Sequence, residues 1–289
     1  MSCIEKIYSV SALIGSNACN ANCSFCAAKE LRKDAIDNGE VARNFKEACK
    51  LSARYGGWSL SLTSTGEPTM SPYSINNYLK EYSEIADQGA YFPNVNLFTN
   101  GIKFADDDFC DMYLKYWKSL GLTNIAISFH DVSEEGQARA YGIDVYPSIK
   151  KIVNNIRKHG LGVRGTLLLH KDIIDNAKSY SRAVDTLINE YGIDNITSWK
   201  IGNPDGSNNE HSPSLLGYLS IRWWLLRNTK SCHSHSWGGG IYDYKGNILR
   251  ITDYVTKHDP RKDYVRQLVS FQDGTVCYSW IKNGALCLK

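Results

Sequence analysis

Residues 8–26 read YSVSALIGSNACNANCSFC and join a short apolar run to three closely spaced cysteines. The run Tyr8–Gly15 has the length and composition of a buried β-strand. The cysteines that follow it, Cys19, Cys23 and Cys26, have the spacing C-x3-C-x2-C. The functional residues of parallel α/β folds gather where strands end, so the thiols stand where chemistry is expected.

The first 205 residues alternate short apolar runs with longer amphipathic stretches. This alternation predicts an α/β fold with a parallel sheet and right-handed crossovers. We expect strands at Tyr8–Gly15, Trp58–Leu62, Val95–Phe98, Asn124–Phe129, Gly162–Leu169 and Asn195–Ile201. We expect helices at Asn44–Tyr55, Tyr73–Asp87, Asp106–Leu120, Tyr146–His159 and Asn176–Tyr191.

The pattern changes after about residue 205. A helix is predicted at Pro213–Arg227, and two hairpins follow, each with a turn signal between its strands. We therefore expect two regions, residues 1–205 and a small C-terminal antiparallel extension, residues 206–289, that packs on the edge of the first. The strands of the hairpins are expected at Ile241–Tyr244 with Ile248–Ile251, and at Leu268–Phe271 with Val276–Ile281.

The composition is that of an ordinary globular protein. The 289 residues are 43% hydrophobic and 22% charged, and the formal net charge is +3. This charge is too small to favour nucleic acid as a partner. No apolar run approaches the roughly 18 residues that span a membrane, and the start of the chain lacks a secretion signal. We expect a cytoplasmic protein without a membrane partner.

The cysteine count favours metal binding over disulfides. Nine cysteines are many for a reducing compartment, and only three of them lie close together. Three thiolates on one loop can hold three irons of a [4Fe–4S] cubane and leave the fourth iron open to a ligand. Zinc is the alternative, but zinc sites usually have four protein ligands in paired clusters, and a second pair is absent here.

With this spacing, and Phe25 before the last cysteine, the segment resembles the signature of the radical S-adenosylmethionine (SAM) superfamily. The resemblance implies a partial (β/α)6 TIM-like barrel with the cluster on Cys19, Cys23 and Cys26. It also implies that SAM binds the open iron and that an electron from the cluster cleaves it. The 5′-deoxyadenosyl radical then abstracts a hydrogen atom from the substrate. Flavodoxin or ferredoxin is the expected electron donor.

Motifs after later strands extend the resemblance to about residue 205. They lie in order along the chain, although Gly-Glu-Pro and Asn-Gly also suit plain turns, and Arg164 on the fifth strand also suits a salt bridge. The resemblance implies that SAM contacts come from Phe25, Gly66, Glu67, Asn100, Ser128, Arg164, Ile201 and Gly202. Glu67 is expected at the SAM ammonium and Arg164 at its carboxylate. His130 is a candidate for substrate binding or proton transfer, with a structural role as the alternative.

Cys232 is a candidate hydrogen-atom donor, because some relatives use a thiol in the C-terminal region. The alternatives are a second cluster shared with Cys277 and Cys287, or a plain core position. For the reaction we favour epimerisation, dehydrogenation or rearrangement of a small molecule or peptide, since a cobalamin-binding segment is not recognisable. The alternatives are an activase of a glycyl-radical enzyme and an RNA-modifying enzyme.

Overall fold

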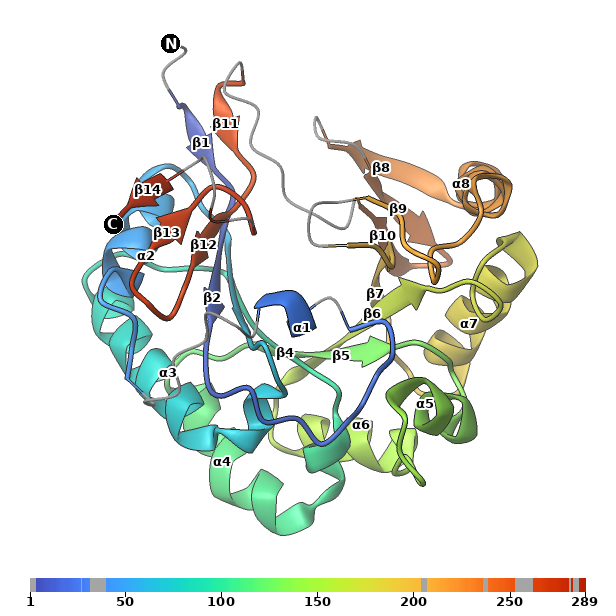
Figure 1. Ribbon diagram of the computed structural model, residues 1–289, viewed down its shortest axis with the longest axis horizontal. Helices are drawn as coiled ribbons and strands as arrows, with labels where there is room; N and C mark the ends of the chain where they lie inside the picture. The colour runs from blue at the N-terminus through green and yellow to red at the C-terminus, as the bar shows by residue number, and fades with distance from the viewer. Residues whose placement is uncertain are drawn as a thin grey trace.

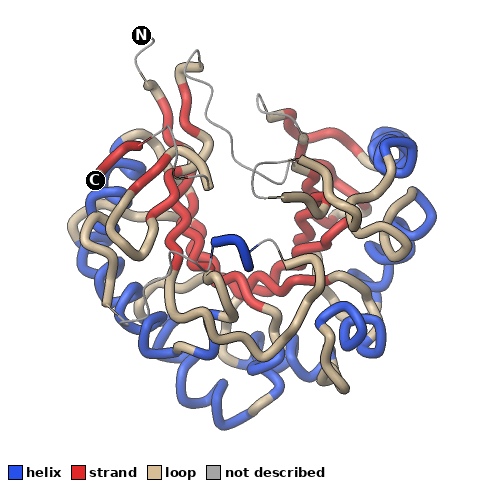
Figure 2. The backbone as a smooth tube through the Cα atoms, viewed as in Figure 1, coloured by secondary structure: helices blue, strands red, loops and turns tan. Residues whose placement is uncertain are grey.

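Six parallel strands form the centre of the structure, a computed structural model that describes residues 4–26, 28–31, 40–203, 207–235, 239–252, 262–280, 282 and 286–289. Neighbouring strands pair in parallel in the order of the chain. Figure 2 shows them curving into an incomplete barrel with helices outside. The partial TIM-like barrel is confirmed. Its strands are β2 (Ser9–Leu13), β3 (Ser59–Thr63), β4 (Asn94–Thr99), β5 (Asn124–Phe129), β6 (Gly162–Leu169) and β7 (Asn195–Lys200).

The C-terminal strands extend this sheet at both edges. One side carries β10 (Asn247–Ile251), parallel to β7, and then β9 (Gly240–Tyr244) and β8 (Lys230–Ser234), both antiparallel to their neighbours. The other side carries β12 (Leu268–Ser270), parallel to β2, then β13 (Val276–Cys277) and β14 (Leu286–Leu288). Both predicted hairpins are present. Each enters the barrel sheet through one parallel strand, so the extension flanks the barrel instead of packing on one edge.

A separate two-stranded parallel sheet pairs β1 (Lys6–Ile7) with β11 (Tyr264–Val265). The predicted helices are present to within a few residues. The helix α5 was not anticipated, because its first half, Glu-Glu-Gly-Gln, lacks an apolar stripe. The helices are α1 (Ala28–Leu31), α2 (Phe45–Arg54), α3 (Pro72–Asp87), α4 (Asp107–Ser119), α5 (Glu134–Tyr141), α6 (Ile149–Lys158), α7 (Ala177–Asn189) and α8 (Leu215–Asn228).

The hydrophobic core lies between the outer face of the sheet and the helices. Because side chains alternate along a strand, Leu60 and Leu62 of β3 point outward and are fully buried, while Ser59 and Ser61 point inward. The helices match this face with apolar residues three and four apart, as in α6, where Ile149, Ile152, Val153 and Ile156 are buried. No described helix is long and apolar enough to cross a membrane.

Candidate functional site

The three motif cysteines lie on the segment between β2 and α1, which passes in front of the barrel in Figure 1 before it turns back to α1. This segment and the residues that follow the other strands form one rim. We call this rim the mouth and define it as residues 16–26, 64–69, 98–101, 128–130 and 201–202. Within it Cys19 is exposed, whereas Cys23 and Cys26 are partly buried.

The cysteine thiols are close enough to influence one another. Burial raises the pKa of Cys23 to about 12, and the Cys26 and Cys19 thiols contribute. Within the described residues, no three His, Cys, Asp or Glu side chains form a ligand group for one metal ion. A cubane does not require such convergence, because its thiolates bind separate irons. Three soft thiol donors on one segment therefore fit a [4Fe–4S] cluster better than a single ion.

Backbone contacts hold the cysteine segment against neighbouring strand ends. A Cβ at Gly66 would stand 2.2 Å from the Ala18 carbonyl oxygen, so a side chain is excluded there. The Glu67 N–H donates to the same oxygen at 2.8 Å. From the other side, the Asn22 N–H donates to the Tyr141 carbonyl at the end of α5, at 2.7 Å. The position of the thiols is thus set by backbone contacts from two elements.

Glu67 is 3% exposed, and both of its carboxylate oxygens accept hydrogen bonds. Its Oε1 accepts from the Thr69 N–H at 3.1 Å, the Thr69 hydroxyl at 2.7 Å and the Thr99 hydroxyl at 2.6 Å. Its Oε2 accepts from the Asn100 N–H at 2.8 Å, and the Asn100 side chain donates to Asn20 Oδ1 at 2.7 Å. Burial raises the pKa of Glu67, and these donors oppose the rise. Glu67 therefore ties the ends of β3 and β4 together and, through Asn100, to the cysteine segment.

Phe25 lies against three imidazole rings. Its ring centroid is 4.6 Å from that of His130, 4.8 Å from that of His170 and 5.7 Å from that of His211. Burial lowers the pKa of His130 to about 3, with His170 adding repulsion, so His130 is neutral at pH 7. Its Nδ1 has no hydrogen-bond partner among the described residues. His170 and His211 were not predicted, because single histidines in loops carry no local pattern.

The remaining mouth residues lie at the ends of β5 and β7. The Ser128 carbonyl accepts a hydrogen bond from the Tyr141 hydroxyl at 2.8 Å. Ile201 is 5% exposed, its carbonyl accepts from the Ser212 hydroxyl at 2.7 Å, and Gly202 is buried beside it. The structure therefore brings Ser128, Ile201 and Gly202 to the rim that also carries the cysteines.

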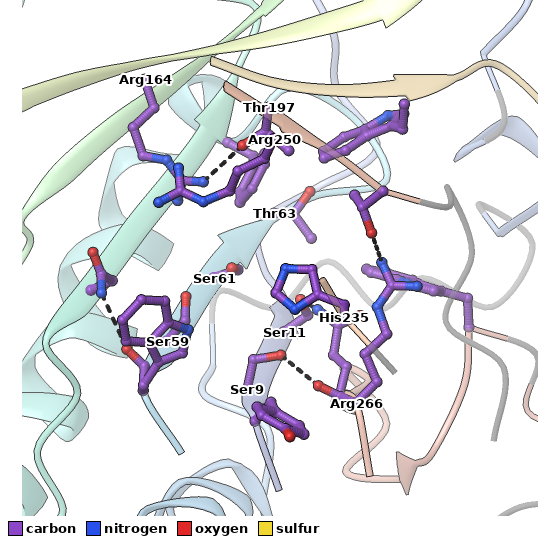
Figure 3. A pocket seen from close by; sticks show the side chains of 18 of the residues that line it. Ser9, Ser11, Ser59, Ser61, Thr63, Arg164, Thr197, His235, Arg250 and Arg266 are labelled. Carbon is purple, nitrogen blue, oxygen red and sulfur yellow. Dashed lines mark hydrogen bonds between the residues drawn. The ribbon is translucent and has the colours of Figure 1, made fainter. Parts of the chain in front are cut away.

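Arg164 lies elsewhere, in the wall of a cavity of about 730 Å³ inside the barrel. It is the third residue of the eight in β6, well before the strand end. Its guanidinium donates to Asn96 Oδ1 at 2.8 Å. It also donates to Thr197 Oγ1 at 3.1 Å, as Figure 3 shows. The cavity reaches the mouth, since Leu13 and Ser64 also line it. The structure thus separates Arg164 from the other predicted SAM contacts.

Of the three C-terminal cysteines, Cys277 and Cys287 lie on paired strands, and Cys232 lies apart from both. Cys232 is exposed on β8, the last strand at one edge of the sheet. Cys232 is the extra residue of a bulge between Ser231 and His233, and it is not among the residues that line the cavity, whereas His233 and His235 are. Cys277 and Cys287 lie on β13 and β14, at the opposite edge (Figure 1). A cluster shared by all three is therefore not favoured.

The polar inner face of the barrel was missed from the sequence, although a signal exists there. Parallel strands covered on both faces usually appear as continuous apolar runs. Here β2, β3 and β4 read SVSAL, SLSLT and NVNLFT, with polar residues at alternate positions. This period of two indicates a sheet with one polar face, and in a barrel that face encloses a polar cavity.

The fold and the mouth define a barrel enzyme with its reaction centre at the carboxyl ends of the strands. A family model described as the radical SAM superfamily matches residues 13–183, more than half of the chain. This chain belongs to the radical SAM superfamily. It is an enzyme of the kind that uses a [4Fe–4S] cluster and SAM.

One curated relative is the 7,8-dihydro-6-hydroxymethylpterin dimethyltransferase of Methanocaldococcus jannaschii, which is 31% identical over 151 residues. The match covers 50% of this chain and 27% of that protein, so the chain spans about a quarter of the relative.

Two solved structures with bound SAM have the same fold. One is anSMEcpe, with a TM-score of 0.53 and 15% identity, covering 74% of this chain and 58% of that chain. The other is SuiB of Streptococcus suis, with a TM-score of 0.58 and 13% identity, covering 99% of this chain and 62% of that chain. At these identities the likeness concerns the fold alone.

Proposed function

We propose that this enzyme binds a small-molecule substrate in its barrel cavity and removes a hydrogen atom from it. The observation that carries this proposal is the cavity of about 730 Å³, which extends from Lys6 and Trp58 near the strand starts to Leu13 and Ser64 beside the mouth. Pockets for small ligands measure roughly 300–1,000 Å³. A substrate in this space can present one end to the cofactors.

In this proposal Cys19, Cys23 and Cys26 hold the cluster. When bound, the cluster and SAM would supply the radical chemistry that removes a hydrogen atom from the substrate. The exposure of Cys19 gives an electron donor such as flavodoxin or ferredoxin access to this side of the site.

The other mouth residues orient SAM and exclude water. Phe25, Gly66, Asn100, Ser128, Ile201 and Gly202 form the proposed binding surface. Glu67 holds that surface in place through its hydrogen bonds to both strand ends, with Oε2 nearest the Asn100 backbone. Neutral His130 retains one ring nitrogen for a hydrogen bond to a ligand.

We further propose a division of labour along the chain. Residues 1–205 carry the cofactor site, and residues 206–289 act as the substrate and cap region. In support, His233, His235, Arg250 and Arg266 line the cavity and all come from the second region. A cavity of this size inside the barrel suits a small molecule or a peptide end better than the large surface of an activase target or an RNA.

Methyl transfer is a second candidate, favoured by the similarity to the methanogen dimethyltransferase. The two reactions differ in the fate of the SAM methyl group. Hydrogen abstraction leaves this methyl group on methionine, whereas methyl transfer moves it to the substrate.

The test uses anaerobically reconstituted protein, dithionite and SAM labelled with carbon-13 in its methyl group. We expect about four irons per chain, and 5′-deoxyadenosine with labelled methionine as products. Label in a compound other than methionine and unreacted SAM supports methyl transfer instead. If protein loaded with iron cleaves no SAM, both proposals are wrong.

A further inference from the structure

The barrel cavity is far more basic than the chain as a whole. The described residues that line it include Lys6, Arg164, Arg250 and Arg266 and no aspartate or glutamate. The formal net charge of all 289 residues is only +3. Positive charge is therefore concentrated in the barrel interior, which we define as the inner face of the strands from β12 to β10.

Arg164 is held there by neutral groups alone. Its two terminal nitrogens donate to Asn96 Oδ1 and Thr197 Oγ1. Its Nε is buried and has no partner within the described residues. A guanidinium has five N–H donors in a fixed plane, so this one retains capacity for an anionic acceptor.

Arg250 lies close to Arg164 and also lacks an anionic partner within the described residues. Its guanidinium donates to Asn195 Oδ1, another neutral acceptor, and neither arginine makes an ion pair within the described residues. Burial lowers the pKa of Arg164 to about 10, and repulsion from Arg250 adds to this effect. Burial also lowers the pKa of Arg250. Arg164 therefore remains charged at neutral pH despite a like-charged neighbour (Figure 3).

Arg164 and Arg250 are partly buried, and two such neighbouring cations with no counter-ion in the described part of the chain are costly, because burial removes hydration that an opposite charge replaces. We propose that Arg164 and Arg250 bind an anionic oxygen group of the substrate, a carboxylate or a phosphate, inside the barrel. This inference rests on the proposed function and adds to it the chemical class of the substrate.

The position of the pair places this anion site below the mouth. Arg164 is two residues before Thr166, which pairs with Ser128 of the mouth, a step of about 7 Å along a strand at roughly 3.3 Å per residue. The substrate would hold its anionic group deep in the barrel and its reacting carbon toward the mouth. The resemblance to the superfamily instead assigned Arg164 to the SAM carboxylate, so the test must distinguish the two ligands.

The experiment measures thermal unfolding of the reconstituted protein in sodium phosphate, sodium acetate and sodium chloride at matched ionic strength. We expect at least one oxyanion to raise Tm in a concentration-dependent way beyond chloride, because a ligand of the native state stabilises it. A larger effect of phosphate assigns a phosphate group, and a larger effect of acetate assigns a carboxylate.

The variants Arg164→Gln and Arg250→Gln should each lower the affinity for the oxyanion about tenfold or more, since each loses a charge-assisted hydrogen-bond donor. Arg250→Lys keeps the charge but loses the planar set of N–H donors, so its affinity for the oxyanion should lie between those of wild type and Arg250→Gln. Arg250→Lys also takes the place of Arg250→Gln in this experiment if the glutamine variant does not fold. Arg227→Gln is the matched control, because Arg227 lies over the exposed Trp223 ring on α8.

Affinity for SAM is measured on the same proteins and should change by no more than about twofold in the Arg164 and Arg250 variants, a difference well under 1 kcal/mol. The inference is overturned if neither oxyanion exceeds chloride, if the double glutamine variant responds as wild type does, or if Arg164→Gln loses SAM affinity while it keeps the oxyanion response. Formation of 5′-deoxyadenosine tests the proposed function separately, because the Tm shifts require no turnover.

Discussion

The mouth and the interior of the barrel use polar side chains in opposite ways. At the mouth, the buried carboxylate of Glu67 is fully satisfied and accepts four hydrogen bonds, although His130 Nδ1 has no partner among the described residues. In the interior, Arg164 and Arg250 keep their charge without a counter-ion in the described part of the chain. A region with satisfied groups is rigid before its ligand arrives, whereas a region with unsatisfied groups requires its ligand.

This difference corresponds to two kinds of ligand. Apart from Ile201 and Gly202, the mouth belongs to the part of the chain that matches the superfamily, and a rigid rim suits cofactors that all members share. The interior takes Arg250 and Arg266 from the region after residue 205, where substrate contacts are proposed. Changes at the mouth should therefore alter cofactor binding and stability, and changes in the interior should alter substrate binding.

The largest effect is expected at the cysteine segment. Cys23→Ala removes one of three proposed ligands and should lower iron from about four per chain to near zero, with complete loss of 5′-deoxyadenosine formation. Iron content and product are measured on anaerobically reconstituted protein. Cys232→Ala is the control, since it also removes a cysteine that is not buried. Equal iron in the two variants would contradict the assignment.

The next effect is expected at Glu67. In Glu67→Gln an amide group replaces one carboxylate oxygen, so a buried N–H such as that of Asn100 faces another donor. A lost buried partner costs about 1–3 kcal/mol, and the mouth should loosen with it. We expect lower unfolding free energy in urea and weaker SAM binding, with iron content retained.

Glu84→Gln provides the reference for Glu67→Gln, because Glu84 is largely exposed and its ion pair with Lys46 is long, at 3.6 Å. Its substitution should cost less than about 0.5 kcal/mol. If the two variants are equally stable and bind SAM equally well, Glu67 has no role in holding the mouth.

The sequence predicted the mouth better than the interior for a physical reason. Strands and the turns after them are local features, so Asn124–Phe129 and Gly162–Leu169 were predicted with the bounds that the structure shows. The cysteines, Glu67 and Asn100 directly follow such strands. A strand end is therefore sufficient to place them on one rim.

The interior depends on pairings that have no local signal. Arg250 enters the barrel because β10 pairs with β7, so that Arg250 lies beside Thr197. The hairpin pattern predicted β9 and β10 but not the strand that β10 would join. Arg164 was recognised as a cation among apolar residues, yet its depth became clear only from its position in β6. The serines of β2 and β3 did carry a signal, their alternation, which was not used.

A smaller effect is expected from the titration of His130. Its folded pKa of about 3 lies below the roughly 6.5 of an unfolded histidine, so acidification adds a proton to the unfolded chain alone. Stability should fall as pH drops below 6.5, and this residue should contribute about 2 kcal/mol of loss between pH 7 and pH 5. The measurement compares urea unfolding of wild type and His130→Phe at both values of pH. The same loss in both proteins would show that His130 is not the titrating group.

The smallest effect is expected at Cys232. Its substitution tests whether the barrel interior extends to this residue of β8. The side chain is exposed on β8 and does not line the cavity that His233 and His235 line. Cys232→Ala should therefore change the unfolding free energy by no more than about 0.5 kcal/mol and leave iron content, SAM cleavage and product unchanged. Cys277→Ala, at a fully buried position, should cost about 1–3 kcal/mol by comparison.

A hydrogen-donor role requires a different result for Cys232→Ala, because a substrate radical without its donor gives side products and excess 5′-deoxyadenosine. Such products would mean that Cys232 reaches the substrate during turnover, and that the interior includes this part of β8.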